Sequence, residues 1–271
     1  IFECFSADWS TPQAGNNLSA VFRFLPLGSL RSVYNSSFRD IYVGNAYWFM
    51  RGETALFWGN SVRDVTCVTG GGFVNLAGTA GQPKNTFDNI YINGGASGEW
   101  LFRVDAMIAD HFVEVNNCAA GMLRDVGGGT HMIRHLALEK GNFTSNTTLF
   151  DVSNSRLYAT GTIYAQLLTL AANIQVTGFS NSGTNSTINV RDFIWSFAAG
   201  GHGAGSKFFV YNGNPANPAI FDYVTGPFSA PAATPVSALT DIGSTASADF
   251  VRVSNWSDSS RIAFAGDADY T

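Results

Sequence analysis

The residues of this chain that are best suited to chemistry are acidic side chains lying among aromatic ones. They gather in one stretch of the chain, at Asp88, Asp105, Asp110 and Glu114. Paired carboxylates serve as the acid, base and nucleophile of glycoside hydrolysis. If the protein cleaves a glycan, we therefore expect Asp88, Asp110 and Glu114 to be catalytic. The alternative interpretation is a solvated acidic surface, because exposed Asp and Glu are common.

A second set of side chains is suited to holding a sugar. Its members are two tyrosines and a Glu-Trp pair, at Tyr42, Tyr91, Glu99 and Trp100. Aromatic rings offer flat apolar faces, and a carboxylate accepts hydrogen bonds from hydroxyl groups. We therefore predict that these four residues bind substrate. The alternative is a plain solvated sheet, on which Tyr is common because it favours strands.

The histidines and cysteines show no metal or nucleophile pattern. They are His111, His131, His135, His202, Cys4, Cys67 and Cys118. His131 and His135 are four residues apart, which is metal-binding spacing only on a helix. Three cysteines without a C-x-x-C pair indicate neither zinc nor a disulfide framework. Phosphate-loop, nucleophile-elbow and zinc-protease motifs are missing from the sequence. We expect no cofactor and no metal.

The elements that must position these residues repeat along the chain. The pattern apolar-x-x-apolar-x-apolar occurs at Phe38/Ile41/Val43, Val62/Val65/Cys67, Phe87/Ile90/Ile92 and Ile133/Leu136/Leu138, with a weaker copy at Val113/Val115. The middle positions advance in steps of 24, 25, 23 and 23 residues. A steady period with one short alternating strand per unit, and no long helix between copies, predicts a parallel β-helix.

Aligning the copies predicts which side chains share a face of the β-helix. The outward position between the two inward aliphatic residues is occupied in turn by Tyr42, Thr66, Tyr91, Glu114 and Ala137. Neighbouring parallel strands lie about 4.8 Å apart, so these side chains should form one column. The predicted sugar-binding tyrosines and Glu114 belong to it.

The position just before each aliphatic pair is rich in Asp and Asn. It is occupied in turn by Asp40, Asp64, Asn89, Phe112 and His135. Asp and Asn accept hydrogen bonds from nearby backbone N–H groups and tolerate unusual φ/ψ angles, so we interpret them as strand-bend residues. Arg39 and Arg63 precede the two aspartates. A stacked Arg–Asp ladder is therefore favoured over a catalytic carboxylate pair at Asp40 and Asp64.

The repeat divides the chain into three parts. Residues 1–30 lack it and are expected to cap the first coil, and residues 31–200 hold the coils. Residues 201–271 are expected to form a C-terminal module, with a Pro/Ala/Ser-rich linker at 227–248 and a terminal hairpin. A second strand per coil leaves alternatives open, since either Leu101/Arg103 or Phe102/Val104 could face inward. The predicted fold class is all-β, a right-handed single-stranded parallel β-helix with a small C-terminal β module.

Composition narrows the classes of function. The chain has 29 Gly and only 13% charged residues, as expected for many turns around a stacked β core. A net charge of −5 argues against a nucleic-acid partner. No run of 18 apolar residues is present, so we expect no membrane insertion. The first residue is Ile1 rather than Met, and we expect a processed chain or part of a longer one.

A resemblance to known proteins appears in two strand segments. Ser37–Val43 and Thr86–Ile92, with Asp or Asn before the aliphatic pair, resemble the coil strands of right-handed parallel β-helix proteins. A capping segment, a run of coils and a Pro/Ala/Ser-linked β tail together resemble bacteriophage tailspikes and tail fibres. The shared motif is a strand signature that pectate-lyase-like enzymes also carry, so it supplies no catalytic residue.

The resemblance implies a homotrimer in the virion tail, outside the bacterial cell, that attaches to a surface polysaccharide or lipopolysaccharide. Many members of that class also cleave the glycan. The resemblance further implies contact with other tail proteins through a preceding N-terminal part. Two alternatives stay open. One is a monomeric polysaccharide lyase or hydrolase of the pectate-lyase-like type, and the other is a non-enzymatic structural or adhesive β-solenoid.

Overall fold

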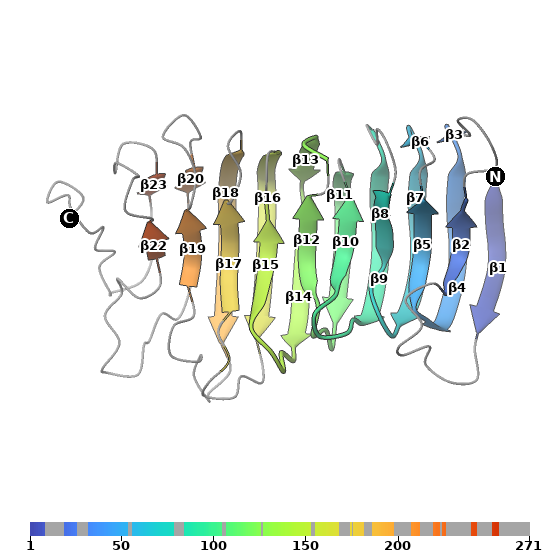
Figure 1. The fold of residues 1–271 in the computed structure, drawn as a ribbon, viewed down its shortest axis with the longest axis horizontal. Coiled ribbons are helices and arrows are strands. Elements are labelled where there is room, and N and C mark those ends of the chain that lie inside the picture. Colours follow the sequence, from blue (N-terminus) through green and yellow to red (C-terminus); the bar gives the residue numbers. More distant parts are fainter. Residues whose placement is uncertain are drawn as a thin grey trace, which may run out of the picture.

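The structure of the chain is a computed structural model built of parallel strands that stack into a long solenoid (Figure 1). It describes residues 1–8, 19–25, 32–53, 56–78, 84–104, 107–125, 127–152, 155–167, 174, 176–181, 186–197, 207–211, 219–222, 224–225, 240–242 and 251–254. Within these ranges the regular elements are all strands, and they pair in parallel. The prediction of an all-β parallel β-helix is confirmed.

The described strands form two large sheets and one small one. The larger sheet has 12 described strands: β1 (Phe2–Asp8), β4 (Ser37–Ala46), β7 (Ser61–Thr69), β9 (Thr86–Gly94), β11 (Met107–Asn116), β13 (Thr130–Ile133), β14 (Leu136–Gly141), β16 (Arg156–Leu167), β18 (Thr187–Phe197), β20 (Ala219–Asp222), β21 (Val224–Thr225) and β23 (Val251–Ser254). We call it the first sheet.

The second sheet has nine described strands: β2 (Ala20–Phe24), β5 (Trp48–Glu53), β8 (Val74–Gly78), β10 (Trp100–Val104), β12 (Gly121–Asp125), β15 (Thr147–Asp151), β17 (Val176–Asn181), β19 (Lys207–Tyr211) and β22 (Thr240–Ile242). β3 (Ser32–Tyr34) and β6 (Leu56–Trp58) pair separately. Strands of the two large sheets alternate along the chain, so each coil contributes to both.

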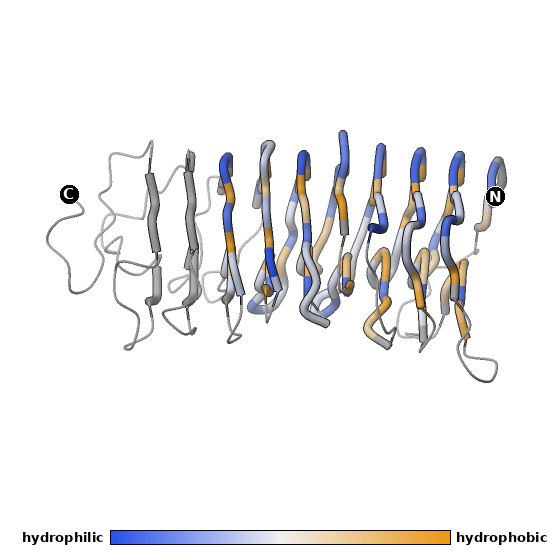
Figure 2. Tube along the Cα trace, turned by 90° about the horizontal axis from the view of Figure 1, so that it is seen from above, coloured by the Kyte–Doolittle hydropathy of each residue, from blue (hydrophilic) through white to orange (hydrophobic). Residues whose placement is uncertain are grey.

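The core is a set of apolar columns that run along the solenoid. Ile41, Val65, Ile90 and Val113 are register partners in successive coils, and each is 2% exposed or less. Figure 2 shows the alternation of hydrophobic and hydrophilic residues along the coils that this inward packing requires. Burying such side chains contributes about 1.5–3 kcal/mol each.

Aromatic side chains extend these columns. Phe49 lies flat on Phe73, with ring centroids 4.9 Å apart and planes 7° apart. Phe150 and Phe179 repeat this geometry at 4.9 Å and 14°. Stacking follows from the fold, because register partners in parallel strands place like side chains one coil apart. In the second sheet Phe102 and Val104 are fully buried, as one of the two alternatives has it, but Leu101 of the other alternative is fully buried as well, while Arg103 is half-buried.

The strand bends predicted at Asp and Asn are present. Asp40, Asp64 and Asn89 have positive φ angles of 55°, 54° and 51°, which these side chains tolerate better than other non-glycine residues do. In β11 the left-handed residue is His111, with φ 47°, and not the aligned Phe112. The register of β11 against β9 shifts between Asp110 and Val113, so this strand carries an extra residue, a β-bulge.

A buried asparagine column fixes the corner that precedes the first-sheet strands. Asn60 and Asn85 are each 1% exposed. Asn60 Nδ2 donates to the carbonyl oxygen of Val33 at 3.0 Å and to Asn85 Oδ1 at 3.2 Å. Asn85 Nδ2 donates to the carbonyl oxygen of Phe57 at 2.8 Å. These bonds satisfy backbone carbonyls at the turn and tie adjacent coils together.

Both ends of the chain contribute strands to the stack. The expected cap at residues 1–30 contains β1 and β2, which pair with β4 and β5 and so add a coil.

At the C-terminal end, β19 and β20 continue the two sheets. β22 lies within the tract expected to be a linker, 227–248, and pairs with β19. Val251–Ser254 pairs in parallel with β20, whereas the rest of the expected terminal hairpin, including 262–264, lies outside the described residues. The domain boundaries themselves stay predictions.

The inward register can be tested at the centre of the column. Ile90→Asp places an unpaired carboxylate among apolar side chains, which costs several kcal/mol or forces protonation. We expect loss of soluble folded protein. Thr66→Asp is the matched control, because Thr66 is the half-exposed register partner of Tyr91, next to Ile90. Expression and thermal melting followed by circular dichroism check both variants. Normal melting of Ile90→Asp would contradict the register.

Candidate functional site

The predicted column of outward side chains exists on the first sheet. Tyr42 pairs in register with Thr66, Thr66 with Tyr91, and Tyr91 with Glu114. Tyr42 is 47% exposed, and the other three are half-buried. Glu114 pairs in turn with Ala137, which is 6% exposed and presents nothing to solvent. The column therefore offers two phenol rings, a hydroxyl and a carboxylate along four coils.

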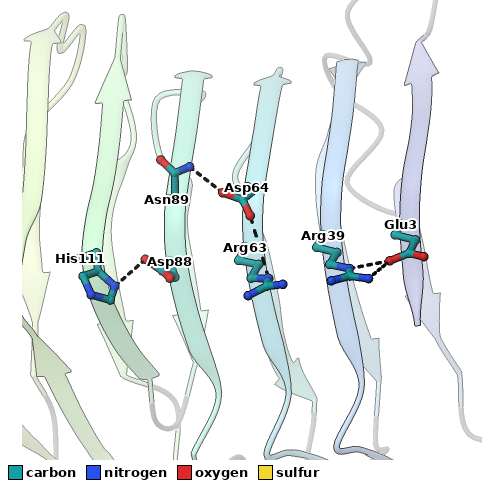
Figure 3. Close-up of polar contacts among 7 residues, drawn as sticks. All are labelled: Glu3, Arg39, Arg63, Asp64, Asp88, Asn89 and His111. Atoms are coloured by element: carbon teal, nitrogen blue, oxygen red, sulfur yellow. Dashed lines mark hydrogen bonds and ion pairs between the residues drawn. The ribbon is translucent and has the colours of Figure 1, made fainter.

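A charged row runs beside this column. Its members in successive coils are register partners: Glu3, Arg39, Arg63, Asp88 and Asp110. Figure 3 shows that the polar contacts of this surface cross from one coil to the next as well as along a strand. Each of the last four members is followed in its strand by the residue with a positive φ angle, namely Asp40, Asp64, Asn89 or His111, so the two rows are distinct.

The predicted Arg–Asp ladder is only partly formed. Arg63 Nε lies 3.9 Å from Asp64 Oδ2, while Arg39 forms a hydrogen-bonded ion pair with Glu3 of the preceding coil. Asp64 also accepts a 2.6 Å hydrogen bond from Asn89 Nδ2 (Figure 3). All of these groups are partly solvent-exposed, so each pair contributes at most about 1 kcal/mol.

The structure brings two of the three candidate catalytic carboxylates together. Asp88 and Asp110 are direct register partners in adjacent coils. One coil step is about 4.8 Å, close to the roughly 5 Å separation of the carboxyl groups in retaining glycosidases. Glu114 lies beyond the β-bulge, opposite Tyr91, and so belongs to the neighbouring column. Asp105 lies outside the described residues.

Each of these two carboxylates is engaged by a basic side chain. His111 Nδ1 lies 3.0 Å from Asp88 Oδ1, and Arg134 Nη1 lies 2.9 Å from Asp110 Oδ1. His111 and Arg134 are exposed, with side chains 75% and 61% accessible. Their contacts occupy carboxylate oxygens that a substrate would otherwise reach. Both acids of this surface therefore already have a hydrogen-bonding partner on the protein.

The β-bulge of β11 adds an aromatic contact at this surface. The rings of Phe112 and His135 stack with centroids 4.9 Å apart and planes 13° apart. Phe112 is 39% exposed, which is unusual for a phenylalanine in a strand. The extra residue of the bulge thus aims an apolar ring outward beside Asp110 and Arg134.

The other two predicted binding residues lie by the second sheet. Glu99 Oε1 accepts a 2.9 Å hydrogen bond from the hydroxyl of buried Tyr47. Burial and then this bond to Glu99 raise the pKa of Tyr47 to about 12. The guanidinium carbon of Arg124 lies 5.9 Å from the centroid of the half-buried Trp100 ring, a cation–π distance. A Cβ at Gly121 would lie 2.5 Å from that ring, so only glycine fits beneath it.

One exposed aromatic pair was not predicted from the sequence. Tyr34 of β3 and Trp58 of β6 are register partners whose rings stack at 5.4 Å and 13°. They are 55% and 37% exposed. They are separated by 24 residues, which is one coil period, so the repeat contained the signal.

One of the described histidines, His131, is buried. His131 Nε2 lies 3.1 Å from Asp125 Oδ1, and both side chains are buried. Asp125 also accepts hydrogen bonds from the N–H of Gly128. His202 and the side chain of Cys4 lie outside the described part of the chain. Cys67 and Cys118 are buried free thiols, and burial raises the pKa of Cys118 to about 12.

The described residues show neither a metal-binding cluster nor a membrane-spanning helix. No group of three or more His, Cys, Asp or Glu side chains in that part of the chain is arranged to hold a metal ion. The same residues include no helix long and apolar enough to cross a membrane.

Comparison with known proteins does not assign the chain to a family. No protein-family model, no curated protein and no solved structure matches it.

The Tyr47–Glu99 contact gives a testable pH dependence. The folded-state pKa of Tyr47, about 12, lies above the ordinary value of 10.0. Its contribution to stability is therefore complete below about pH 10 and is lost as the pH rises through about 12. We expect Glu99→Gln to lower the pKa of Tyr47, because the nearby negative charge disappears. Ultraviolet titration of the variant, with Tyr47→Phe to identify the signal, checks this. An unchanged titration would show that burial alone sets the pKa.

Proposed function

We propose that this chain is a surface-glycan-binding β-solenoid that serves as the receptor-binding part of a bacteriophage tail protein. The single observation that carries the proposal is the in-register column of Tyr42, Thr66, Tyr91 and Glu114 on the first sheet. A glycan chain is itself a repeating polymer, and this surface repeats polar and aromatic groups along one axis. The parallel β-solenoid fold is compatible with an adhesive or polysaccharide-binding role.

The neighbouring rows support the same interpretation. The half-buried acids Asp88 and Asp110 and their exposed partners His111 and Arg134 flank the column and would offer donors and acceptors to sugar hydroxyl groups. The exposed rings of Tyr34 and Trp58 add a second aromatic contact on the same coils. Aromatic side chains on a solvated surface mark interaction sites more often than single aliphatic ones do.

The proposed partner is a polysaccharide or lipopolysaccharide of the bacterial surface, and the proposed assembly is a homotrimer in the virion tail. The elongated shape and the resemblance of the coil strands to those of tailspikes support this placement. Neighbouring tail proteins would contact the trimer through a part that precedes the coils.

A second candidate function is cleavage of the bound glycan. The observation that favours it is the register pairing of Asp88 with Asp110, one coil apart. Asp110→Asn and Asp88→Asn should each abolish reducing-sugar release from a capsular polysaccharide that the parent protein degrades. If the parent releases no reducing sugar from the polysaccharide that it binds, the protein is an adhesin and not a depolymerase.

The binding column is tested by removing two of its side chains. Tyr91→Ala with Glu114→Ala should weaken binding to host cells or to a glycan array by about tenfold or more, since each contact contributes about 1–3 kcal/mol. Tyr158→Ala with Glu139→Ala is the matched control, because both residues are half-buried in the same sheet outside the column. Equal binding by the parent and the Tyr91/Glu114 variant would place the glycan elsewhere.

The assembly is tested separately by light scattering at micromolar concentration. We expect the mass of a trimer. Truncation after Gly226 should reduce either assembly or thermal resistance, because oligomerisation and stability are linked. A monomeric parent protein would contradict the tail-protein assignment and favour the monomeric enzyme.

A further inference from the structure

Arginines gather in one row on the second sheet. The register partners in successive coils are Arg23, Arg51, Asn75, Arg103, Arg124 and Asp151. This row holds four of the 15 Lys and Arg residues of an acidic chain. Arg23 and Arg124 are exposed, and Arg51 and Arg103 are half-buried. We call it the arginine row.

The arginine row places like charges next to one another. Arg103 and Arg124 are direct register partners, and so are Arg23 and Arg51. Like charges opposite one another in a sheet are destabilising. Burial, and then the charges of Arg124 and Arg51, lower the pKa of Arg103, whereas Glu99 raises it. Folding alone does not require this arrangement, because Asn75 occupies the same position in the coil between.

The two central arginines have capacity left for a ligand. Among the described residues, buried Arg103 Nε has no hydrogen-bond partner. Arg124 has a side chain that is 48% exposed, and its nearest carboxylate oxygen, Asp151 Oδ2, is 3.7 Å from Nε, too far for a good hydrogen bond. Guanidinium groups bind carboxylate, phosphate and sulfate oxygens in a bidentate manner.

An aromatic ring lies within the same patch. The guanidinium of Arg124 lies over the ring of Trp100, and Gly121, which has no Cβ, leaves room for that ring. Glu99, beside Trp100, accepts a hydrogen bond from Tyr47, and its negative charge acts to raise the pKa of Arg103. A ring next to two guanidinium groups suits a sugar that carries an acidic substituent, because the ring contacts the apolar face and the arginines contact the anion.

We propose that the arginine row, centred on Arg103, Arg124 and Trp100, is a binding site for an acidic polysaccharide. This inference rests on the proposed glycan-binding function and adds the class of glycan, one that bears carboxylate or sulfate groups. Arginines that recur in adjacent coils would contact acidic groups along a single polymer chain. The net charge of −5 disfavours a nucleic acid, which needs a broadly basic surface.

The test uses affinity electrophoresis of the full chain in gels that contain polygalacturonate, dextran sulfate or neutral dextran. We expect retardation by one or both acidic polymers and none by neutral dextran. The carboxylate and sulfate gels distinguish the two kinds of acidic group. Added salt should weaken the retardation, because the contacts are ionic.

The variant Arg103→Gln with Arg124→Gln should bind the acidic polymer about tenfold more weakly, or worse, since two charge-assisted contacts are lost. Arg156→Gln with Arg191→Gln is the matched control, because it removes the same charge from exposed positions of the first sheet. Arg124→Gln alone provides a milder variant. Circular dichroism melting verifies that each variant is folded.

The outcomes separate the two proposals. Equal loss in the control variant would show nonspecific attraction and overturn the arginine row as a site. Binding to neutral dextran or to single-stranded DNA as tight as to the acidic polymers would overturn the acidic-glycan specificity. A parent protein that binds bacterial-surface glycans but neither acidic polymer overturns this inference and leaves the proposed function standing. Failure to bind any polysaccharide overturns both.

Discussion

Parallel hydrogen bonding between successive coils is the constraint on which the rest of this structure depends. Each strand pairs with its equivalent one coil earlier and one coil later, so a residue type at one position is repeated as a column. Inside, columns become stacks such as Phe49 on Phe73 and the buried pair Asn60 and Asn85. Outside, the same rule produces rows of Tyr, Asp or Arg. Register is therefore the property that determines both stability and surface chemistry.

The interior stacks fix the register more strongly than the surface does. A slip of one residue would expose the whole apolar set and bury charged groups, at a cost of many kcal/mol. Surface pairs such as Arg63 with Asp64 contribute little by comparison, because water screens them. The surface is consequently free to vary, as at the β-bulge of β11, where the extra residue leaves Phe112 exposed while Val113 stays buried.

The two sheets offer surfaces of different chemistry. The first sheet carries tyrosines, ion-paired acids and basic side chains, and its charges balance within short distances. The second sheet carries the arginine row, in which like charges are neighbours and Trp100 lies under Arg124. The two surfaces belong to different sheets of the same coils, so their chemistry can differ without any change in register.

The repeat alone determined the fold class, the inward residues and the column of Tyr42, Thr66, Tyr91 and Glu114, since these follow from a period of 23–25 residues and from strand alternation. The bends at Asp40, Asp64 and Asn89 could be predicted because few other residues accept a positive φ.

Three features were decided only in the tertiary structure. The β-bulge moved the bend to His111, which a gapless alignment misses. The strand β1 joined the stack because Phe2, Phe5 and Ala7 pair with the pattern residues Phe38, Ile41 and Val43, a copy that its spacing from β4, longer than 23–25 residues, hides in the sequence. The arginine row appeared only with the register of the second-sheet strands, which pairs Arg23 with Arg51 and Arg103 with Arg124. Short second-sheet strands have too few residues to show their inward face by alternation, so packing against the first sheet makes that choice.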